Sequence, residues 1–171
     1  MINRSIVVMG VSGSGKSTIG SALANELRYP FVDGDDLHSK ESVEKMAKAI
    51  ALNDEDRQGW LERINARLAK ANSDSAGVVI AASLLKAQYR KTAVANISPR
   101  PLLVLLSIPL QGSIDRIASR KDHFMPPELA RSQFEILDET TEIDLVVDGT
   151  QRIEKIVREI IDHLHGETGV Q

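Results

Sequence analysis

The feature that most constrains this chain is an eight-residue stretch near its N-terminus, Gly10-Val11-Ser12-Gly13-Ser14-Gly15-Lys16-Ser17. It matches the phosphate-binding pattern Gly-x-x-x-x-Gly-Lys-Ser in full. Glycines permit a tight turn that brings successive backbone N–H groups to bear on one anion. Lys16 supplies a mobile positive charge for the β- and γ-phosphates of ATP, and Ser17 offers a hydroxyl to Mg²⁺.

The segments on either side of this loop have the composition that the motif requires. Residues 5–9 form a short apolar run, so a strand is expected before the loop. Ile19, Ala22, Leu23 and Leu27 recur at helical spacing, so a helix is expected after it, with its positive end toward the phosphates. This context favours a true phosphate loop over a chance glycine-rich turn, but leaves open a loop that binds nucleotide without catalysis. The expected ATP contacts here are Gly10, Ser12, Gly13, Ser14, Gly15, Lys16, Ser17 and Thr18.

Composition limits the class of protein. A chain of 171 residues suits one domain with its own core, here residues 1–171. The net charge of -3 argues against a nucleic-acid partner, and the absence of cysteine excludes disulfides, thiolate metal sites and a cysteine nucleophile. The apolar runs are too short to span a membrane, and residues 1–4 leave no room for a signal peptide. We therefore expect a soluble cytoplasmic protein.

Strand-like and helix-like segments alternate along the chain. Apolar runs predict strands at 5–9, 30–33, 78–82, 102–106 and 144–148. Further helices are expected at 39–48, from an N-cap at Asn53 to 71, around Tyr89, from Pro109 to 117, at 129–137 and at 153–164. This alternation predicts an α/β fold with a mainly parallel sheet between two helical layers. In such sheets, ligands bind at the carboxyl ends of the strands.

Two acidic residues follow the second predicted strand, where such a ligand would lie. Asp33 and Asp35 flank one glycine. Beside a phosphate loop, one carboxylate can hold Mg²⁺, directly or through water, and the other can accept the proton of an attacking hydroxyl. We assign the metal to Ser17 and Asp33, and the proton to Asp35. An aspartate-capped turn without catalytic function would have the same local sequence.

A basic stretch in the second half of the chain is the candidate for a lid over the phosphates, at about 116–127. Arg116 and Arg120 lie four residues apart, which predicts one helical face, and Lys121 and His123 follow. A kinase needs positive charge over the transferring phosphoryl group and has to exclude water. Arg120 is the candidate for transition-state stabilisation. A solvated ion-pair helix would look similar in sequence.

These motifs resemble the small P-loop gluconokinases. The resemblance rests on the phosphate loop; on 33–38, Asp-Gly-Asp-Asp-Leu-His; on 52–57, Leu-Asn-Asp-Glu-Asp-Arg, with Trp60-Leu61; on Ser83, Leu85-Lys86 and Tyr89-Arg90; and on 123–129, His-Phe-Met-Pro-Pro-Glu-Leu, with 132–135, Ser-Gln-Phe-Glu. It covers most of the chain. It implies a nucleoside-kinase-like fold with a mobile lid, ATP-dependent phosphorylation of D-gluconate at its 6-hydroxyl, Mg²⁺, and often a homodimer. Shikimate kinases are more distantly similar.

The chain departs from the usual gluconokinase pattern at a few positions. Ala49, Ala51, Gly59 and Leu84 change backbone stiffness or packing rather than chemical groups. Asp122 adds a negative charge beside the lid cations, which would weaken attraction for phosphate unless it pairs with a neighbouring lysine or points outward. The pattern therefore constrains kinase chemistry more tightly than it constrains the acceptor.

Gluconate carries several hydroxyls and one carboxylate, so its site needs hydroxyl partners and at least one cation. The candidates for substrate contacts are Asp35, His38, Arg57, Lys86, Arg90 and His123. Lys86 and Arg90 lie four residues apart and could serve one ligand or simply be solvated. Arg57 could instead form an ion pair with Asp54 or Asp56 on its own helix. Arg116 is a candidate to stack on adenine, with Gly149-Thr150 along the edge of the base, whereas Trp60 is expected in the core.

Four functions are consistent with these residues. The first is a gluconokinase, and the second is a kinase of the same fold for another small polyol or acid, such as shikimate. The third is a regulatory protein that binds ATP without transferring phosphate, against which Asp33, Asp35 and the lid arginines argue. A nucleoside monophosphate kinase is the fourth. It is disfavoured because residues 34–38 place acids where a second phosphate would need cations.

Overall fold

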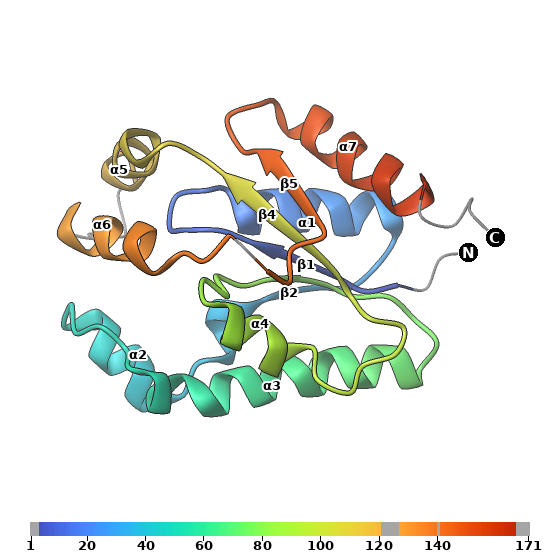
Figure 1. Ribbon diagram of the computed structural model, residues 1–171, viewed down its shortest axis with the longest axis horizontal. Helices are drawn as coiled ribbons and strands as arrows, with labels where there is room; N and C mark the ends of the chain where they lie inside the picture. The colour runs from blue at the N-terminus through green and yellow to red at the C-terminus, as the bar shows by residue number, and fades with distance from the viewer. Residues whose placement is uncertain (1–3, 121–126, 140, 167–171) are drawn as a thin grey trace.

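The computed structural model describes residues 4–120, 127–139 and 141–166. A five-stranded sheet runs through the middle of the molecule, with helices on both faces (Figure 1). All the paired strands are parallel, and their order is β2-β3-β1-β4-β5. The strands are β1 (Ile6–Met9), β2 (Phe31–Asp33), β3 (Val79–Ala81), β4 (Leu102–Ser107) and β5 (Leu145–Asp148). The predicted α/β fold with a parallel sheet between helical layers is confirmed.

Helices α1 and α7 cover one face of the sheet, and α3 and α4 lie on the other (Figure 1). Helices α5 and α6 lie beyond the carboxyl end of β4. The helices are α1 (Lys16–Leu27), α2 (Lys40–Ala47), α3 (Asp54–Ser73), α4 (Ala87–Ala93), α5 (Leu110–Ala118), α6 (Pro127–Ile136) and α7 (Ile153–Gly166), with the short 3₁₀ helix η1 (Gly34–Leu37) after β2.

The central strands are apolar throughout because both of their faces are buried. In β1, Val7 and Met9 pack with the residues of α3 and α4, whereas Ile6 and Val8 pack with those of α1 and α7. Successive side chains of a strand point to opposite faces of the sheet. When helices cover both faces, every position of the strand is buried and favours an apolar residue. All four of these side chains are at most 1% exposed.

Local sequence signals set the helix starts where they were expected. Asn53 caps α3: its side chain accepts from the Asp56 N–H at 2.7 Å, and the Asp56 carboxylate accepts from the Asn53 N–H at 3.1 Å. This reciprocal capping box satisfies two donors that the first turn leaves unpaired. Helix α5 is the exception: it begins one residue later than predicted, at Leu110, with Pro109 as its N-cap rather than in its first turn.

The topology brings the phosphate loop and the acidic turn to one edge of the sheet. Ala81 in β3 lies beside Val8 of β1 on one side and Asp33 of β2 on the other. The strand order reverses direction at β1, and ligands of such sheets bind at that switch point. Within the described residues, no helix is long and apolar enough to cross a membrane. Half of the predicted lid, residues 121–126, lies outside the described residues.

The core predicts a stability test on α3. Leu68 is fully buried, so Leu68→Ala should lower the free energy of unfolding by about 2–5 kcal/mol, through lost burial and the cavity left behind. Urea denaturation followed by circular dichroism measures the change. Val43→Ala on α2 is the control, because Val43 is 48% exposed and its truncation should change stability by less than about 0.5 kcal/mol. Equal losses in the two variants would contradict this assignment of the core.

Candidate active site

The phosphate loop leaves β1 and enters α1 through glycines in left-handed conformations. Gly13 has a φ of +76° and Gly15 a φ of +94°. A Cβ atom on Gly13 would lie 2.9 Å from the carbonyl oxygen of Ser113, so both backbone angle and space require glycine there. Gly15 is the N-cap of α1 and provides no side-chain cap. The N–H groups of the first turn are therefore not capped by the side chain at this position, as an anion site requires.

Helix α5 holds the outer side of the loop through carbonyl oxygens. Ser113 Oγ donates to the Ser12 carbonyl at 2.7 Å, and the Arg116 guanidinium donates to the carbonyls of Gly13 at 3.3 Å and Ser14 at 3.2 Å. Arg116 also donates to the Gly149 carbonyl at 2.9 Å, which ties the loop to the segment after β5. With its carbonyls bound on the outside, the loop can turn N–H groups inward.

Lys16 interacts electrostatically with Asp33, Asp35 and Arg120, the residues predicted to bind the metal or to act in catalysis. Its ammonium donates to the Val11 carbonyl at 3.3 Å, across the loop. Burial lowers the pKa of Lys16, Asp35 and Asp33 oppose that shift, and Arg120 adds to it. Lys16, Asp33, Asp35 and Arg120 are thus close enough to interact electrostatically. Arg120 follows the end of α5 rather than extending its helical face, since the helix ends at Ala118.

The acidic turn is joined directly to the phosphate loop. Ser17 Oγ donates to one carboxylate oxygen of Asp33 at 2.7 Å, and the other oxygen accepts from the Asp35 N–H at 3.0 Å. Asp33 is half-buried, whereas Asp35 is exposed on the 3₁₀ turn η1. Hydroxyl and carboxylate oxygens are the ligand types that Mg²⁺ prefers, so Ser17 and Asp33 form a fitting pair for that ion.

A buried tryptophan of α3 forms a hydrogen bond with the same turn. Trp60 in α3 is fully buried, as predicted, and its Nε1–H donates to the Gly34 carbonyl at 2.7 Å. The His38 ring stacks on Trp60, with centroids 4.7 Å apart and planes 8° apart. Burial lowers the pKa of His38; Asp35 opposes this shift, and Arg57 and Arg63 add to it. His38 is therefore a neutral group at pH 7, suited to a hydroxyl rather than a carboxylate.

Asp54, at the start of α3, binds Lys86, the residue predicted to contact the substrate carboxylate. Its carboxylate accepts from Lys86 Nζ at 2.8 Å, from Gln88 Nε2 at 3.2 Å and from the Tyr89 hydroxyl. The Lys86 and Tyr89 hydrogen bonds lower the pKa of Asp54 to about 2. The guanidinium of Arg57 lies 5.5 Å above the Tyr89 ring, a cation–π contact rather than the ion pair considered from sequence. These groups form the acceptor cluster: Asp54, Arg57, Lys86 and Tyr89.

The expectation that Arg90 binds substrate is corrected by its burial. Arg90 is 1% exposed, and its guanidinium donates to the carbonyls of Leu84 and Leu85 at 2.9 and 3.0 Å. It also donates to the carbonyls of Asp138 and Thr141. Lys86 precedes α4 and Arg90 lies within it, so their spacing of four does not place them on one ligand. Arg90 joins the turn that carries Lys86 to the chain after α6.

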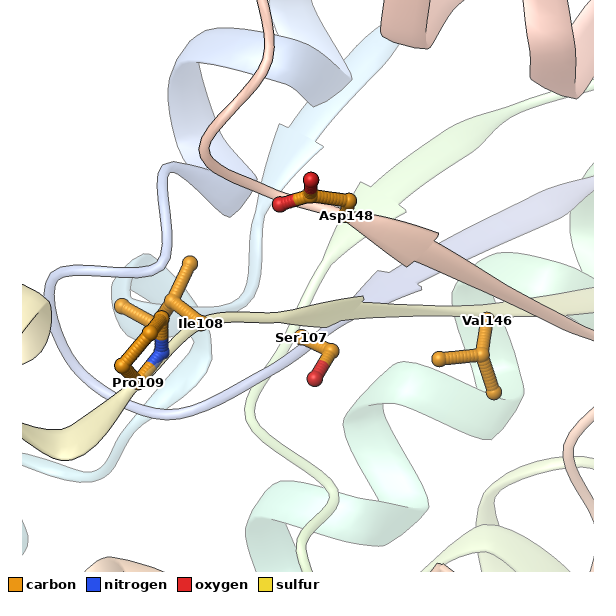
Figure 2. Close-up of a pocket in the computed structure, with 5 residues that line it drawn as sticks. All are labelled: Ser107, Ile108, Pro109, Val146 and Asp148. Carbon is orange, nitrogen blue, oxygen red and sulfur yellow. The ribbon is translucent and has the colours of Figure 1, made fainter.

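A hollow lies at the carboxyl ends of β4 and β5, next to Gly149. Figure 2 shows its lining residues, Ser107, Ile108, Pro109, Val146 and Asp148. Arg116 reaches the same segment after β5, where the sequence predicted adenine. Thr18 is exposed in the first turn of α1. His123 and Asp122 lie outside the described residues, so their roles stay predictions.

Several contacts at this site were not predicted from sequence. Ser113 carried no motif signal, Gln133 was noted only as part of a family match, and Asp54 was noted in such a match and as a possible partner of Arg57 but not of Lys86. Gln133 Oε1 accepts from the Ser12 N–H at 2.6 Å, across more than a hundred residues of sequence. Periodicity cannot reveal such contacts, because they depend on how α3, α5 and α6 are placed around the loop.

Comparison with known proteins defines the class first. A family profile described as shikimate kinase matches residues 12–165. The crystal structure of shikimate kinase from Aquifex aeolicus superposes with a TM-score of 0.62 over 98% of this chain and 99% of that chain, at 23% identity, which shows the shared fold. The fold and the phosphate loop therefore define a small P-loop kinase.

Closer sequence similarity lies with gluconokinases. A probable gluconokinase of Dictyostelium discoideum is 42% identical, covering 93% of this chain and 85% of that protein. The thermosensitive gluconokinase of Escherichia coli K12 is 42% identical over 81% of this chain and 73% of its own length. The crystal structure of a gluconokinase from Sinorhizobium meliloti 1021 matches with a TM-score of 0.85 at 40% identity, covering 95% of this chain and 92% of that chain. The chain belongs to the gluconokinase family.

The contrast between Arg90 and Lys86 predicts two different defects. Arg90→Ala removes a donor from four carbonyls, of which that of Leu85 keeps the Asp138 N–H, and should lower the free energy of unfolding by at least about 2 kcal/mol. Lys86→Ala removes one partly exposed ion pair, so stability should change by less than about 1 kcal/mol while the KM for the acceptor rises. Urea denaturation and steady-state kinetics on both variants measure this. A stable Arg90→Ala protein with a raised acceptor KM would restore the original expectation.

Proposed function

We propose that this protein transfers the γ-phosphoryl group of ATP to the 6-hydroxyl of D-gluconate, forming 6-phospho-D-gluconate. The observation that carries the proposal is the 2.7 Å contact between Ser17 of the phosphate loop and Asp33 of the acidic turn. It joins the nucleotide site to the carboxylates that an acceptor hydroxyl would meet. The gluconokinase names of the relatives supply the acceptor.

The residues around the phosphate loop fit ATP with Mg²⁺. Inward N–H groups of the loop and the first turn of α1 hold the phosphates, and Lys16 neutralises the β- and γ-phosphates. Ser17 and Asp33 hold Mg²⁺, Asp33 directly or through water. When bound, the ion draws charge from the phosphate oxygens. Arg116, which donates to the Gly149 carbonyl after β5, faces the adenine.

The acceptor lies between η1 and the acceptor cluster. Lys86 and Arg57 receive the gluconate carboxylate, and neutral His38 bonds a hydroxyl. Asp35 is exposed beside the metal ligand, so it orients the reacting hydroxyl and takes its proton late. The transition state for phosphoryl transfer is loose, so positioning contributes more than basicity. Arg120, in the same field as Lys16, stabilises the developing charge, and His123 is a further substrate contact.

The enzyme is also expected to act in the cytoplasm, where ATP is supplied. The family resemblance implies that it can form a homodimer.

A kinase for a related acid is the second candidate, because the matching family profile is described as shikimate kinase. The sequence identity to shikimate kinase structures is low, which favours gluconate.

A coupled ADP-release assay over a panel of acceptors tests the function. We expect turnover with D-gluconate, and kcat/KM at least about tenfold lower with shikimate, other sugar acids and nucleoside monophosphates, because each misplaces a hydroxyl or a charge. Lys16→Ala is the inactive control. Preferred turnover of another acid would keep the kinase but change its substrate. ATP binding without turnover on any acceptor would point to a regulatory protein.

The two aspartates should fail in different ways. Asp35→Asn keeps the shape but loses the charge, so it should bind ATP normally, bind gluconate within about tenfold of wild type and lose most of kcat. Asp33→Asn should show a defect that rising Mg²⁺ partly relieves. Magnesium titrations of kcat for the two variants decide between these roles. Rescue of Asp35→Asn but not of Asp33→Asn would reverse the assignment.

A further inference from the structure

The peptide group of Ser12 is bound on both sides by helices from the second half of the chain. Its carbonyl accepts from Ser113 Oγ of α5 at 2.7 Å, and its N–H donates to Gln133 Oε1 of α6 at 2.6 Å. These contacts have opposite consequences for a phosphate loop. The contact to α5 uses a carbonyl that no phosphate needs, whereas the contact to α6 uses an N–H of the kind with which the loop cradles phosphate.

The other α5 contacts follow the same rule. Within the loop, Arg116 donates to carbonyls, those of Gly13 and Ser14, and its remaining contact is with the Gly149 carbonyl. All three contacts from α5 therefore remain possible when an anion is bound. The side-chain oxygen of Gln133 is different, because it accepts from a loop N–H and would compete with a phosphate oxygen for that donor.

We propose that Gln133 is a positioning residue of the phosphate loop: its side-chain oxygen holds the Ser12 N–H in the ligand-free enzyme and is displaced by the phosphates of ATP. The proposal rests only on the ATP-binding part of the proposed function. The side chain keeps the N–H paired and the loop in shape while no anion is bound. ATP then binds in exchange for one hydrogen bond.

The surrounding packing allows this exchange without moving the helix. The next residue, Phe134, and Leu137 pack on the cluster of Val11, Leu85 and Ile108, which includes a residue of the loop itself. Gln133 is half-buried, so its side chain has solvent into which it can turn. The backbone of α6 is thus anchored while the amide remains free to rotate.

The test is the equilibrium affinity for a non-hydrolysable ATP analogue with Mg²⁺, measured by calorimetry without an acceptor. Gln133→Ala and Gln133→Met both remove the competing oxygen, so each should bind the analogue about two- to tenfold more tightly than wild type, the range of one net hydrogen bond. Gln133→Glu should bind it at least about tenfold more weakly, because an ionised carboxylate holds the N–H more strongly and repels phosphate. Gln111→Ala on α5 is the matched control, since Gln111 bonds only Asp115 of its own helix among the contacts found.

Each outcome decides the proposal. Weaker binding by folded Gln133→Ala and Gln133→Met would make Gln133 a phosphate ligand, and unchanged binding would make the contact irrelevant to nucleotide; either result overturns the displacement. Thermal unfolding checks the fold, and Gln133→Met retains side-chain bulk if the alanine variant is unstable. Absence of ATP-analogue binding by the wild type would instead refute the nucleotide part of the proposed function.

Discussion

The structure depends on how one loop divides its backbone polar groups. A loop that directs several N–H groups at one anion has to turn its carbonyls the other way, and those carbonyls need donors. Helix α5 provides them through Ser113 and Arg116, about a hundred residues further along the chain. The phosphate loop is therefore complete only when the second half of the fold is in place. This explains how a motif of eight residues can require a whole domain.

The parts predicted correctly are those that local physics controls. Strands such as β1 are short apolar runs between breakers, the Asn53 cap has its partner three residues away, and Trp60 lies on an apolar helical face. The misassigned residue, Arg90, has the same local signal as a ligand-binding arginine. Its role is decided by the Leu84 turn and by a segment about fifty residues away, which no spacing rule brings together. The sequence does not show which distant residues a cationic side chain will contact, and that contact decides whether the side chain binds a ligand or holds the fold together.

The proposed acceptor site contains its own anion, the Asp54 carboxylate. Asp54 already neutralises Lys86, so a substrate carboxylate gains only the difference between its contacts and those of Asp54. This arrangement favours ligands that bring both a carboxylate and hydroxyls, because a lone anion replaces one ion pair with another. It also explains how kinases with one fold can differ in acceptor. The fold is shared with shikimate kinases, and a shared fold does not fix the acceptor, which depends on the side chains that line the site.

The position of Trp60 makes it an intrinsic fluorescence probe of the acidic turn. It is the single tryptophan of the chain, its Nε1–H donates to the carbonyl of Gly34 between Asp33 and Asp35, and its indole stacks on His38. Its ultraviolet emission therefore comes from one defined place, directly beneath the acidic turn. Any ligand that shifts this turn or changes the charge of the stacked imidazole alters the intensity of that emission. Acceptor binding can thus be followed in real time without attaching a dye.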